Sequence, residues 1–568
     1  MRFLIILAGL AASAVAVPHD DHNSTEVVVI PTSTHSHDHG ASVPPSSSPT
    51  SPATSAPTGC CLLHTDADFP TPAEWASALP GVQPPTPFGT HARPDYVLRA
   101  TCVAQVQSAV RFAAARNIRL SVLNSGHDFL GRNDAPSGLS LDISKLGGVR
   151  VATVYTATRE GAVVTFGAGL STQQINDAVD RSGLTTVGAA HGSVKTAGGW
   201  GQAGGHGPLS SKYGLGVDQV LEYKVVIANG SLLTANSLSE PDLFWALRGG
   251  GGGTFGVVVE ATIKAYPTPR MTVTNWWINA TSSSTTTNST TNSTSEYWDA
   301  VAYLHSQFPA LNKRGVQGYF YIYPAAVQGV FMTAGSDAGI SAAKERWEPV
   351  LKRMGRFPGM KPATAKYYDY ASYKARLLSA AHLRSPRLAS ALAAAYPRAH
   401  EGLLRGHLVG GGAVLSSGEN TSVLPAWRSA YVHLVGTGVG RFNVSSLRTL
   451  APDSGAYVNE ASALNPHWKG DFWGGNYKRL AEIKTTYDPE GVFWITPGIG
   501  ADRYEVRDGR LCRSKEVRDT EIAPTSDNVN IGVRHKEGYD TLSAFPGAME
   551  PDLDQGTCRA AAEGHARR

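Results

Sequence analysis

The chain has 568 residues, of which 42% are hydrophobic, enough to build a large core and to exclude a wholly disordered protein. The formal net charge is +4, a surplus too small to indicate nucleic acid as a partner. Glycine accounts for 60 of the 568 residues, a larger share than the ordinary value of about 7%. We therefore expect many positions at which the backbone turns tightly or approaches a ligand closely.

The N-terminus is typical of a secreted protein. Arg2 precedes an apolar run over residues 3–10, and Ala14-Val15-Ala16 supplies small residues before a cleavage site, which predicts a signal peptide over residues 1–16. No later apolar stretch is long enough to span a bilayer, so we expect an extracellular protein with no membrane partner. Sequons for N-glycans, expected on exposed loops, occur at Asn23, Asn229, Asn279, Asn288, Asn292, Asn420 and Asn443.

Five cysteines in an oxidising compartment predict one or two disulfides and at least one unpaired thiol. Cys60 and Cys61 open the folded region and Cys512 lies near its end, so one possible bridge ties these ends together. Cys102, at the start of an expected helix, is a candidate buried thiol.

Changes in composition divide the chain into segments. Ser, Thr, Pro and His dominate the leader, and its His35–His39 run is expected to be solvated rather than to bind a metal, so no metal site is predicted. The expected segments are the signal peptide (1–16), a disordered leader (17–59), a Pro-rich irregular segment around Trp75 (60–90), a first domain (91–269), a second domain (270–455), a C-terminal segment (456–497) and a partly disordered extension (498–568).

The first domain alternates strand-like and helix-like patterns, which predicts an α+β fold. Thr101 is expected to cap a helix, Ser171 and Gln174 form a capping-box signal for another, and Gly183 should end that second helix. Asn229-Gly230 predicts a hairpin with a type I′ turn. Strands are expected over residues 96–99, 118–123, 139–143, 163–166, 223–227, 231–234 and 255–263, and a short helix over 241–247.

The second domain begins near Arg270, and residues 281–295 form a low-complexity stretch that we expect to be a surface loop. Tyr373, Leu377 and Ala380 follow a helical spacing, which predicts helix between residues 367 and 395. A further helix is expected over residues 477–486.

Three glycine-dense segments dominate the first domain: residues 125–127, 188–207 and 249–256. Glycine lets backbone N–H groups approach a phosphate or a planar ring, although each segment alone could also be a tight turn. No P-loop, no G-x-S-x-G elbow and no H-E-x-x-H helix is present, and the strand and helix context of a Rossmann fingerprint is missing.

The ordered set of motifs resembles a known family. The motifs are Pro94–Val97, Ser125–Gly131, Ala197–Leu209, Tyr213–Asp218, Asp242–Gly250, Tyr457–Glu460, Phe472–Tyr477 and Lys484–Pro489. Together they resemble those of the fungal berberine-bridge-enzyme-like flavoproteins, which have a PCMH-type FAD-binding domain and belong to the vanillyl-alcohol-oxidase superfamily. The resemblance implies an α+β fold. It comprises an FAD domain of two α+β subdomains, a substrate domain with an antiparallel sheet and flanking helices, and a C-terminal segment that returns to the FAD domain.

The resemblance also implies a covalent FAD cofactor. In such enzymes the histidine of the Ser-Gly-His loop, here His127, bonds to the 8α-methyl group of the flavin. Many relatives carry a second link through a cysteine, but His191 holds the corresponding position here and no cysteine falls within residues 188–207. A second cysteinyl link is therefore not expected, and His191, which we count among the candidate catalytic residues with Glu460 and Tyr457, should line the pocket near the flavin or simply pack there.

The remaining FAD contacts implied by the resemblance are backbone groups of the glycine loops. They are expected at Ser125, Gly126, Gly198, Gly199, Gly205, Gly256 and Val257. Asn476 resembles a family asparagine that faces the isoalloxazine ring, although a structural hydrogen bond would explain it equally well.

The residues from Tyr457 to Glu460 are candidates for the catalytic base. In plant relatives this tetrad usually ends in a tyrosine, whereas Glu460 holds that place here and, with a reference pKa of about 4.3, could accept a proton directly. A structural salt bridge is the equal alternative. If the tetrad is a strand, Glu460 faces away from Asn459 and Tyr457, so only one set can point to the flavin.

We therefore expect a secreted FAD-dependent oxidoreductase that oxidises an alcohol, a sugar or a secondary metabolite by hydride transfer to flavin, with O₂ as acceptor and H₂O₂ as product. The expected partners are a small-molecule substrate and O₂, and the expected state is a monomer carrying N-glycans. The alternatives are a flavin dehydrogenase or oxidative cyclase that reacts poorly with O₂, and a non-catalytic flavin-binding glycoprotein.

Overall fold

A computed structural model describes residues 58–84, 94–135, 137–154, 161–280, 293–323, 325–361, 363–366, 376–379, 383–395, 403–437 and 444–514. The signal peptide, most of the leader with its His35–His39 run, residues 281–292, and Tyr373 and Ala380 lie outside these ranges, as does the extension beyond residue 514. None of the helices in the described part of the chain has the length and apolar character needed to cross a membrane.

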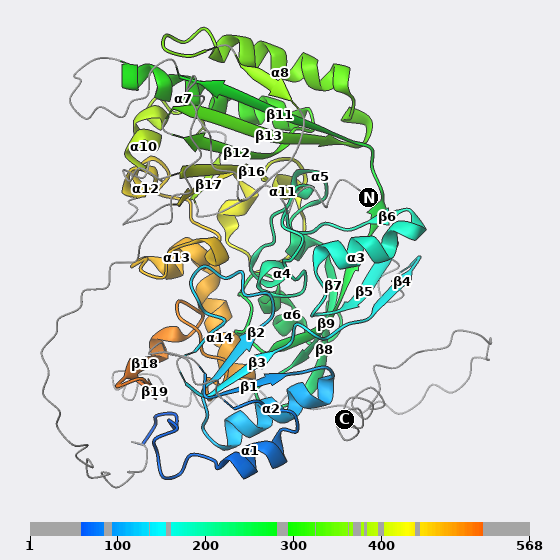
Figure 1. Cartoon of the computed structure of the whole chain (residues 1–568), viewed down its shortest axis with the longest axis vertical. Helices are drawn as coiled ribbons and strands as arrows, with labels where there is room; N and C mark the ends of the chain where they lie inside the picture. The colour runs from blue at the N-terminus through cyan, green and yellow to red at the C-terminus, as the bar shows by residue number, and fades with distance from the viewer. Residues whose placement is uncertain are drawn as a thin grey trace, which may run out of the picture.

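The first domain, which the resemblance implies to be an FAD domain and which is called so below, contains two sheets (Figure 1). The smaller is parallel, in the order β1 (Tyr96–Arg99), β3 (Leu139–Asp142), β2 (Leu120–Leu123). The larger is antiparallel, in the order β4 (Val149–Ala152), β5 (Val163–Gly167), β9 (Val257–Lys264), β7 (Val220–Val226), β8 (Leu232–Asn236). Helix α2 (Val103–Ala115) contacts both sheets, and α3 (Thr172–Val179) and α6 (Pro241–Leu247) border the larger one. These elements confirm the predicted α+β fold.

The N-terminal segment is more regular than its proline content predicted. Helix α1 (Pro72–Ala78) begins with a capping box between Thr71 and Glu74, and Trp75 is fully buried with its ring stacked on that of Tyr96 at 4.1 Å. A proline at the first helical position is compatible with a helix because its missing N–H would have no intrahelical partner there. The expectation of an irregular segment around Trp75 was therefore wrong.

Two local predictions in the FAD domain need correction. Thr101 is not the cap of α2; the cap is Cys102, and Thr101 instead hydrogen-bonds to the Gln105 side chain. The hairpin between β7 and β8 forms, but Gly230 alone has the positive φ, 78°, which a type I′ turn requires of Asn229 as well. The loop is therefore a longer hairpin turn closed by the Ile227 N–H to Ser231 carbonyl hydrogen bond. By contrast, the Ser171–Gln174 capping box and the helix end at Gly183 are confirmed.

The substrate domain is a seven-stranded antiparallel sheet with helices on one face (Figure 1). The strands lie in the order β14 (Thr364–Lys366), β11 (Met271–Asn279), β13 (Ala326–Ala334), β12 (Gln317–Tyr323), β16 (Leu403–Leu408), β17 (Ala430–Thr437), β15 (Arg376–Ser379). The helices are α7 (Ser293–Lys313), α8 (Ile340–Met354), α10 (Leu388–Ala395) and α12 (Ser445–Leu450). The helix predicted between residues 367 and 395 is partly wrong, because Leu377 lies in β15, which pairs with β17, and helix occurs only later, in α10.

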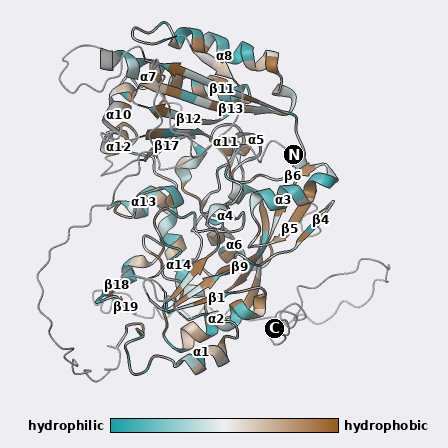
Figure 2. Cartoon of the chain, viewed as in Figure 1, coloured by the Kyte–Doolittle hydropathy of each residue, from teal (hydrophilic) through white to brown (hydrophobic). Residues whose placement is uncertain are grey.

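Alternation along the strands decides which side chains meet the helices. Phe320 of β12 is buried in the cluster beneath the helices, whereas its neighbour Tyr319 packs with the core of the FAD domain. In the same way Leu408 of β16 and Val432 of β17 belong to the helix side. The residues that alternate with Leu408 along β16 and with Val432 along β17 therefore face the FAD domain. In the FAD domain, Figure 2 shows a comparable contrast, with hydrophobic residues along β5 and β9 and hydrophilic ones on helix α3.

The C-terminal segment returns to the FAD domain as predicted. It contains the short 3-10 turn η6 (Val458–Glu460), helix α13 (Trp468–Trp473) and helix α14 (Tyr477–Tyr487), and the hairpin β18 (Tyr504–Arg507)–β19 (Arg510–Arg513) follows it at the start of the extension. Buried Lys484 of α14 pairs with Asp488 at 2.5 Å and donates to the carbonyls of Thr254 (2.6 Å) and Phe493 (2.8 Å). Burial lowers the pKa of the Lys484 amine. One cation thus fastens α14 to the third glycine loop.

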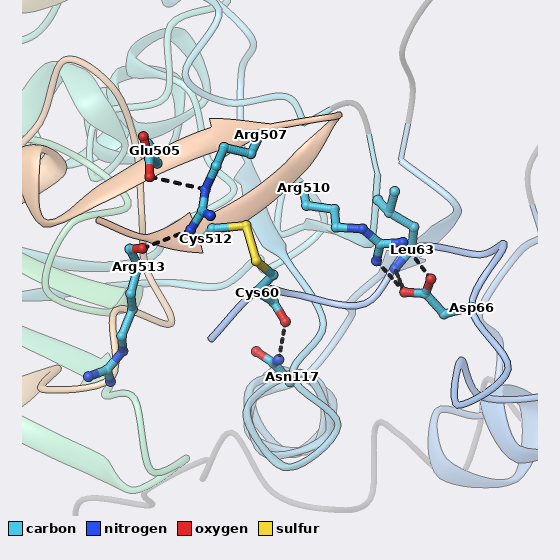
Figure 3. The surroundings of a disulfide bond; sticks show 9 residues. All are labelled: Cys60, Leu63, Asp66, Asn117, Glu505, Arg507, Arg510, Cys512 and Arg513. Carbon is cyan, nitrogen blue, oxygen red and sulfur yellow. Dashed lines mark hydrogen bonds and ion pairs between the residues drawn. A yellow bond between two sulfur atoms is a disulfide. The ribbon is translucent and has the colours of Figure 1, made fainter. Parts of the chain in front are cut away.

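A disulfide between Cys60 and Cys512 joins the start of the described chain to its last hairpin (Figure 3). Beside it, Asn117 donates to the Cys60 carbonyl at 2.6 Å, and Asp66 pairs with Arg510. A bridge between the two ends of the folded region is the possibility that the cysteine positions indicated. Cys102 is disulfide-bonded as well, so it is not the free thiol we expected, and Cys61 is the free cysteine of the described residues.

Candidate active site

An open cavity lies where the FAD domain, the substrate sheet and the C-terminal segment meet. Its lining comes from the loop after β2, the loops around α4 (Gly199–Ala203), the glycine loop before β9, one residue of β12, and η6. Of the residues predicted for the site, those that line this cavity are Ser125, Gly126, His127, Gly198, Gly199, Gly256, Val257, Tyr457 and Glu460. Residues from motifs that lie far apart in the sequence thus line one cavity, as the family resemblance implied.

Three predicted residues do not line the cavity. Gly205 has φ 82° and packs so closely on Gly216 that an added Cβ would lie 2.9 Å from the Gly216 Cα, which indicates a packing role. The Asn476 amide donates to the Val423 carbonyl at 3.0 Å, the structural alternative that we had left open. The His191 ring lies 5.2 Å from that of His127 and is not part of the cavity lining.

The glycine loops offer unused hydrogen-bonding groups to a ligand. Among the described residues, none of the backbone N–H groups from Ser125 to Asp128 donates a hydrogen bond to another protein group. Buried side-chain atoms of the lining that also have no partner in the described chain include Asn124 Oδ1, Asn133 Oδ1 and Gln202 Oε1. Each such group is costly, by about 1–3 kcal/mol, unless something binds it.

The shape of the loops suits a flat, polar ligand. At Gly252 an added Cβ would lie 2.8 Å from the Cα of Gly199, so two of the glycine loops touch through their backbones. Four consecutive free N–H groups are the kind of concavity that binds phosphate oxygens. The residues present therefore fit an FAD molecule, whose pyrophosphate would accept hydrogen bonds from the N–H groups of the loop that contains His127.

His127 is held in place by a short chain of hydrogen bonds. Its Nε2 lies 2.7 Å from the Ser193 hydroxyl, which in turn lies 2.9 Å from Nδ1 of His191. Burial lowers the pKa of His127, and the nearby His191 lowers it further. The His127 imidazole is therefore neutral at neutral pH and keeps a lone pair available for bonding.

The tetrad from Tyr457 to Glu460 does not form a strand. Because Val458–Glu460 is a 3-10 turn, the side chains of Tyr457, Asn459 and Glu460 all line the cavity, and the expectation that Glu460 faces away from the other two was wrong. Asn459 donates to the Tyr457 hydroxyl at 2.8 Å and accepts from Arg132 at 2.8 Å. The turn thus presents three polar side chains on one side.

Tyr457 and Glu460 differ in how they can handle a proton. Burial, and then the adjacent Glu460 carboxylate, raise the pKa of Tyr457 well above its usual value. Tyr457 therefore keeps its proton and donates it to the Trp200 carbonyl at 3.1 Å. Glu460 is 5% exposed and lies 3.0 Å, through Oε2, from Nε2 of His206.

Sequence reasoning missed three histidines around Glu460. His206 follows α4, whereas His407 of β16 and His433 of β17 face each other across the sheet in register. Their Nδ1 atoms are 3.3 Å apart and lie 3.9 Å (His407) and 3.5 Å (His433) from the Glu460 carboxylate. Burial lowers the pKa of both strand histidines well below its ordinary value, so both are neutral.

A signal for these histidines existed only in part. His206 belongs to the Ala197–Leu209 motif, so its place near the flavin loops was available from the sequence. His407 and His433 belong to no motif, and they meet only because β16 and β17 pair in one particular register.

Comparisons with known proteins agree with this geometry. The chain matches the model of the FAD binding domain over residues 94–236 and that of the berberine and berberine-like segment over residues 456–500. It is 32% identical over 484 residues to an FAD-linked oxidoreductase of Arthroderma benhamiae, covering 75% of this chain and 80% of that one. It is 28% identical over 479 residues to the VAO-type flavoprotein oxidase VAO615 of Thermothelomyces thermophilus, covering 77% and 82%.

Among solved structures, it is similar to the VAO-type flavoprotein MtVAO713 from Myceliophthora thermophila C1, with a TM-score of 0.68 and 26% identity over 76% of this chain and 84% of that one. The fold and site define an FAD-binding oxidoreductase. The chain belongs to the family of fungal FAD-linked oxidoreductases and VAO-type flavoproteins with a berberine-bridge-like C-terminal segment.

Proposed function

We propose that this protein is a secreted oxidase that removes a hydride from a hydroxyl-bearing substrate, an alcohol, a sugar or a secondary metabolite, and passes the electrons to O₂ through FAD bound covalently to His127. The observation that carries this proposal is that one cavity is lined by the free N–H groups of residues 125–128, by His127 and by the Glu460 carboxylate. FAD, when bound, supplies the hydride acceptor.

The covalent link rests on the position and state of His127. Its ring lines the cavity, it is neutral, and Ser193 fixes its orientation. The cysteines of the described chain lie outside the lining, and the fifth, Cys558, lies far from the glycine loops in sequence. A single link through His127, without a cysteinyl link, is therefore the arrangement that we propose.

Glu460 is the group that we propose as proton acceptor for the substrate hydroxyl. It is a buried carboxylate on the cavity wall, whereas Tyr457 on the same turn keeps its proton. Asn459 and Arg132 hold the turn from the side of the flavin loops. A positioned base of this kind contributes typically about 10²–10⁴-fold to the rate.

Secretion and the oxidase reaction are supported by separate observations. A disulfide between Cys60 and Cys512 is expected of an oxidising compartment, in agreement with the signal sequence. The sequon asparagines Asn229, Asn279 and Asn420 are exposed, as glycan acceptors must be. Reaction with O₂ is supported by the relative named as a VAO-type flavoprotein oxidase.

The test is an anaerobic screen of the purified full-length protein against alcohols, oligosaccharides and aromatic metabolites, followed by admission of air. The proposal requires at least one class to bleach the flavin absorbance, and air to restore the absorbance with release of about one equivalent of H₂O₂. Bleaching without reoxidation by air would indicate that the protein is a dehydrogenase and not an oxidase. A yellow protein that no class bleaches would contradict a catalytic role.

A further inference from the structure

Three imidazoles and a carboxylate converge beside the cavity, where the second glycine-dense segment meets the substrate sheet and the C-terminal segment. His206, His407, His433 and Glu460 are all buried, and one potential ligand atom from each lies within 4.8 Å of the other three. From this geometry we propose that the four side chains form a binding site for one divalent first-row transition-metal ion such as Zn²⁺.

The spacing of the ligand atoms matches such a site. In a tetrahedral zinc site with bonds of about 2.0–2.1 Å, neighbouring ligand atoms lie about 3.3–3.4 Å apart. Three separations are close to this value: 3.0 Å from His206 Nε2 to Glu460 Oε2, 3.3 Å between the Nδ1 atoms of His407 and His433, and 3.5 Å from His433 Nδ1 to Glu460 Oε2. The separation from His407 Nδ1 to Glu460 Oε2 is longer, 3.9 Å, and no pair of ligand atoms is more than 4.8 Å apart. Small side-chain adjustments would bring all four atoms onto one ion.

Charge gives an independent reason for a cation. Glu460 is 5% exposed, and within the described ranges its ion-pair partners are all histidines, with no lysine or arginine. A buried carboxylate without a cation is costly. A divalent ion bound by the three imidazoles and by Oε2 of Glu460, the oxygen that all three histidines approach, would remove that cost and leave Oε1 as the proton acceptor.

The donor set selects the kind of ion. Three nitrogen ligands and one oxygen suit zinc and its first-row neighbours, whereas Mg²⁺ and Ca²⁺ prefer oxygen throughout. The surroundings suit a structurally held ion, because the rings of Tyr319, Trp427 and Tyr457 pack at 5.0 to 5.6 Å from one or another of the histidine rings. His206 and Glu460 also line the cavity, so an ion here would be reachable by a ligand in the cavity.

The site would also explain why three distant segments meet here. His206 comes from the FAD domain, His407 and His433 from the substrate sheet, and Glu460 from the C-terminal segment. An ion would therefore tie the three parts together at the cavity. This inference goes beyond the proposed function, since metal binding is measured without substrate turnover and holds or fails whether or not the flavin is reduced.

The experiment begins with metal analysis of the full-length protein, produced in a secretory host with a tag that contains no histidine. We expect about one transition-metal ion per chain. After removal with a chelator, added Co²⁺ should produce visible d–d absorption with saturation near one equivalent, and X-ray absorption at the cobalt edge should show imidazole ligands. These two measurements use the wild-type chain alone and do not depend on any variant.

The matched comparison uses two variants. His407→Gln combined with His433→Gln should weaken Co²⁺ binding by more than about 100-fold, because even loss of an outer-sphere partner costs a metal site about 10–100-fold. His305→Gln removes a fully buried histidine of the same domain that lies outside the cluster and should leave Co²⁺ binding unchanged. Metal-free wild-type protein that gives no cobalt spectrum, or equal binding by the double variant and the control, would overturn the proposal.

Discussion

One end of the cavity is lined mostly by backbone and small residues of the FAD-domain loops, whereas the other end is lined by ionisable and aromatic side chains from three separate segments. The first end offers N–H groups from residues 125–128 and a neutral His127. The second gathers Glu460, His206 and two strand histidines. Cofactor binding thus depends on local loop conformation, and substrate chemistry depends on how the domains meet.

The largest expected effect tests whether the second end carries the chemistry. Glu460→Gln keeps the shape of the side chain but removes the proton acceptor, so kcat should fall by about 10²–10⁴-fold while flavin content is unchanged. Rapid-mixing measurement of flavin reduction with a substrate from the screen checks this. Glu482→Gln, an exposed carboxylate on α14, is the control and should behave as the wild type. Reduction within a few-fold of the wild-type rate would mean that Glu460 is structural.

The next prediction concerns the support of the first end. Lys484→Met leaves Asp488 buried without its cation and removes two hydrogen bonds to backbone carbonyls, so the free energy of unfolding should fall by about 3–5 kcal/mol. Lys469→Met removes the exposed pair with Asp502 and should cost about 0–1 kcal/mol. Denaturant unfolding measures both. Equal costs would show that the buried pair does not fasten α14 to the glycine loop.

A third prediction uses a histidine outside the cavity. His305 is buried among the rings of Phe308 and Phe320 on the helix side of the sheet, and burial lowers its pKa to about 4. Between pH 6.5 and pH 4 the unfolded chain binds a proton at this position that the folded protein does not. Stability should therefore fall as the pH is lowered through this window, by about 3 kcal/mol in total.

The measurement is the free energy of unfolding as a function of pH for the wild type and for His305→Leu. The wild type should lose stability more steeply than the variant between pH 6.5 and pH 4, and the two slopes should agree above pH 7. Parallel slopes over the whole range would contradict a neutral, buried His305.

The smallest effect is expected at His191, which the sequence placed among the catalytic residues. In the structure it orients Ser193, which orients His127. His191→Ala should cost about one hydrogen bond, roughly 1 kcal/mol, and slow flavin attachment about fivefold without changing the pH dependence of flavin reduction. The time course of covalent flavin incorporation into apoprotein checks this. A shifted pH profile would instead assign His191 a direct part in the reaction.

The first end of the cavity was readable from the sequence because its function resides in contiguous loops. Ser125, Gly126 and His127 are adjacent in the chain, and the glycines that allow close backbone contact can be recognised directly from the sequence. The capping box at Ser171 and the helix Pro241–Leu247 were predicted for the same reason, since both depend on residues a few positions apart.

The second end could not be read in this way. His407 and His433 lie 26 residues apart and meet only through the pairing of two strands. The direction of Glu460 depended on whether residues 457–460 form a strand or a turn, and packing against the FAD domain selects the 3-10 turn. Leu377 shows the same limit, since its helical spacing was overridden by pairing with β17.

The measurement that tests the central claim most directly is the location of flavin after denaturation of the purified protein. We expect the yellow colour to remain with the precipitated chain, and a proteolytic peptide containing His127 to carry the mass of FAD, whereas His127→Ala should release all flavin on denaturation. Complete release of flavin from the wild-type chain, or a flavin-bearing peptide that lacks His127, would contradict the account.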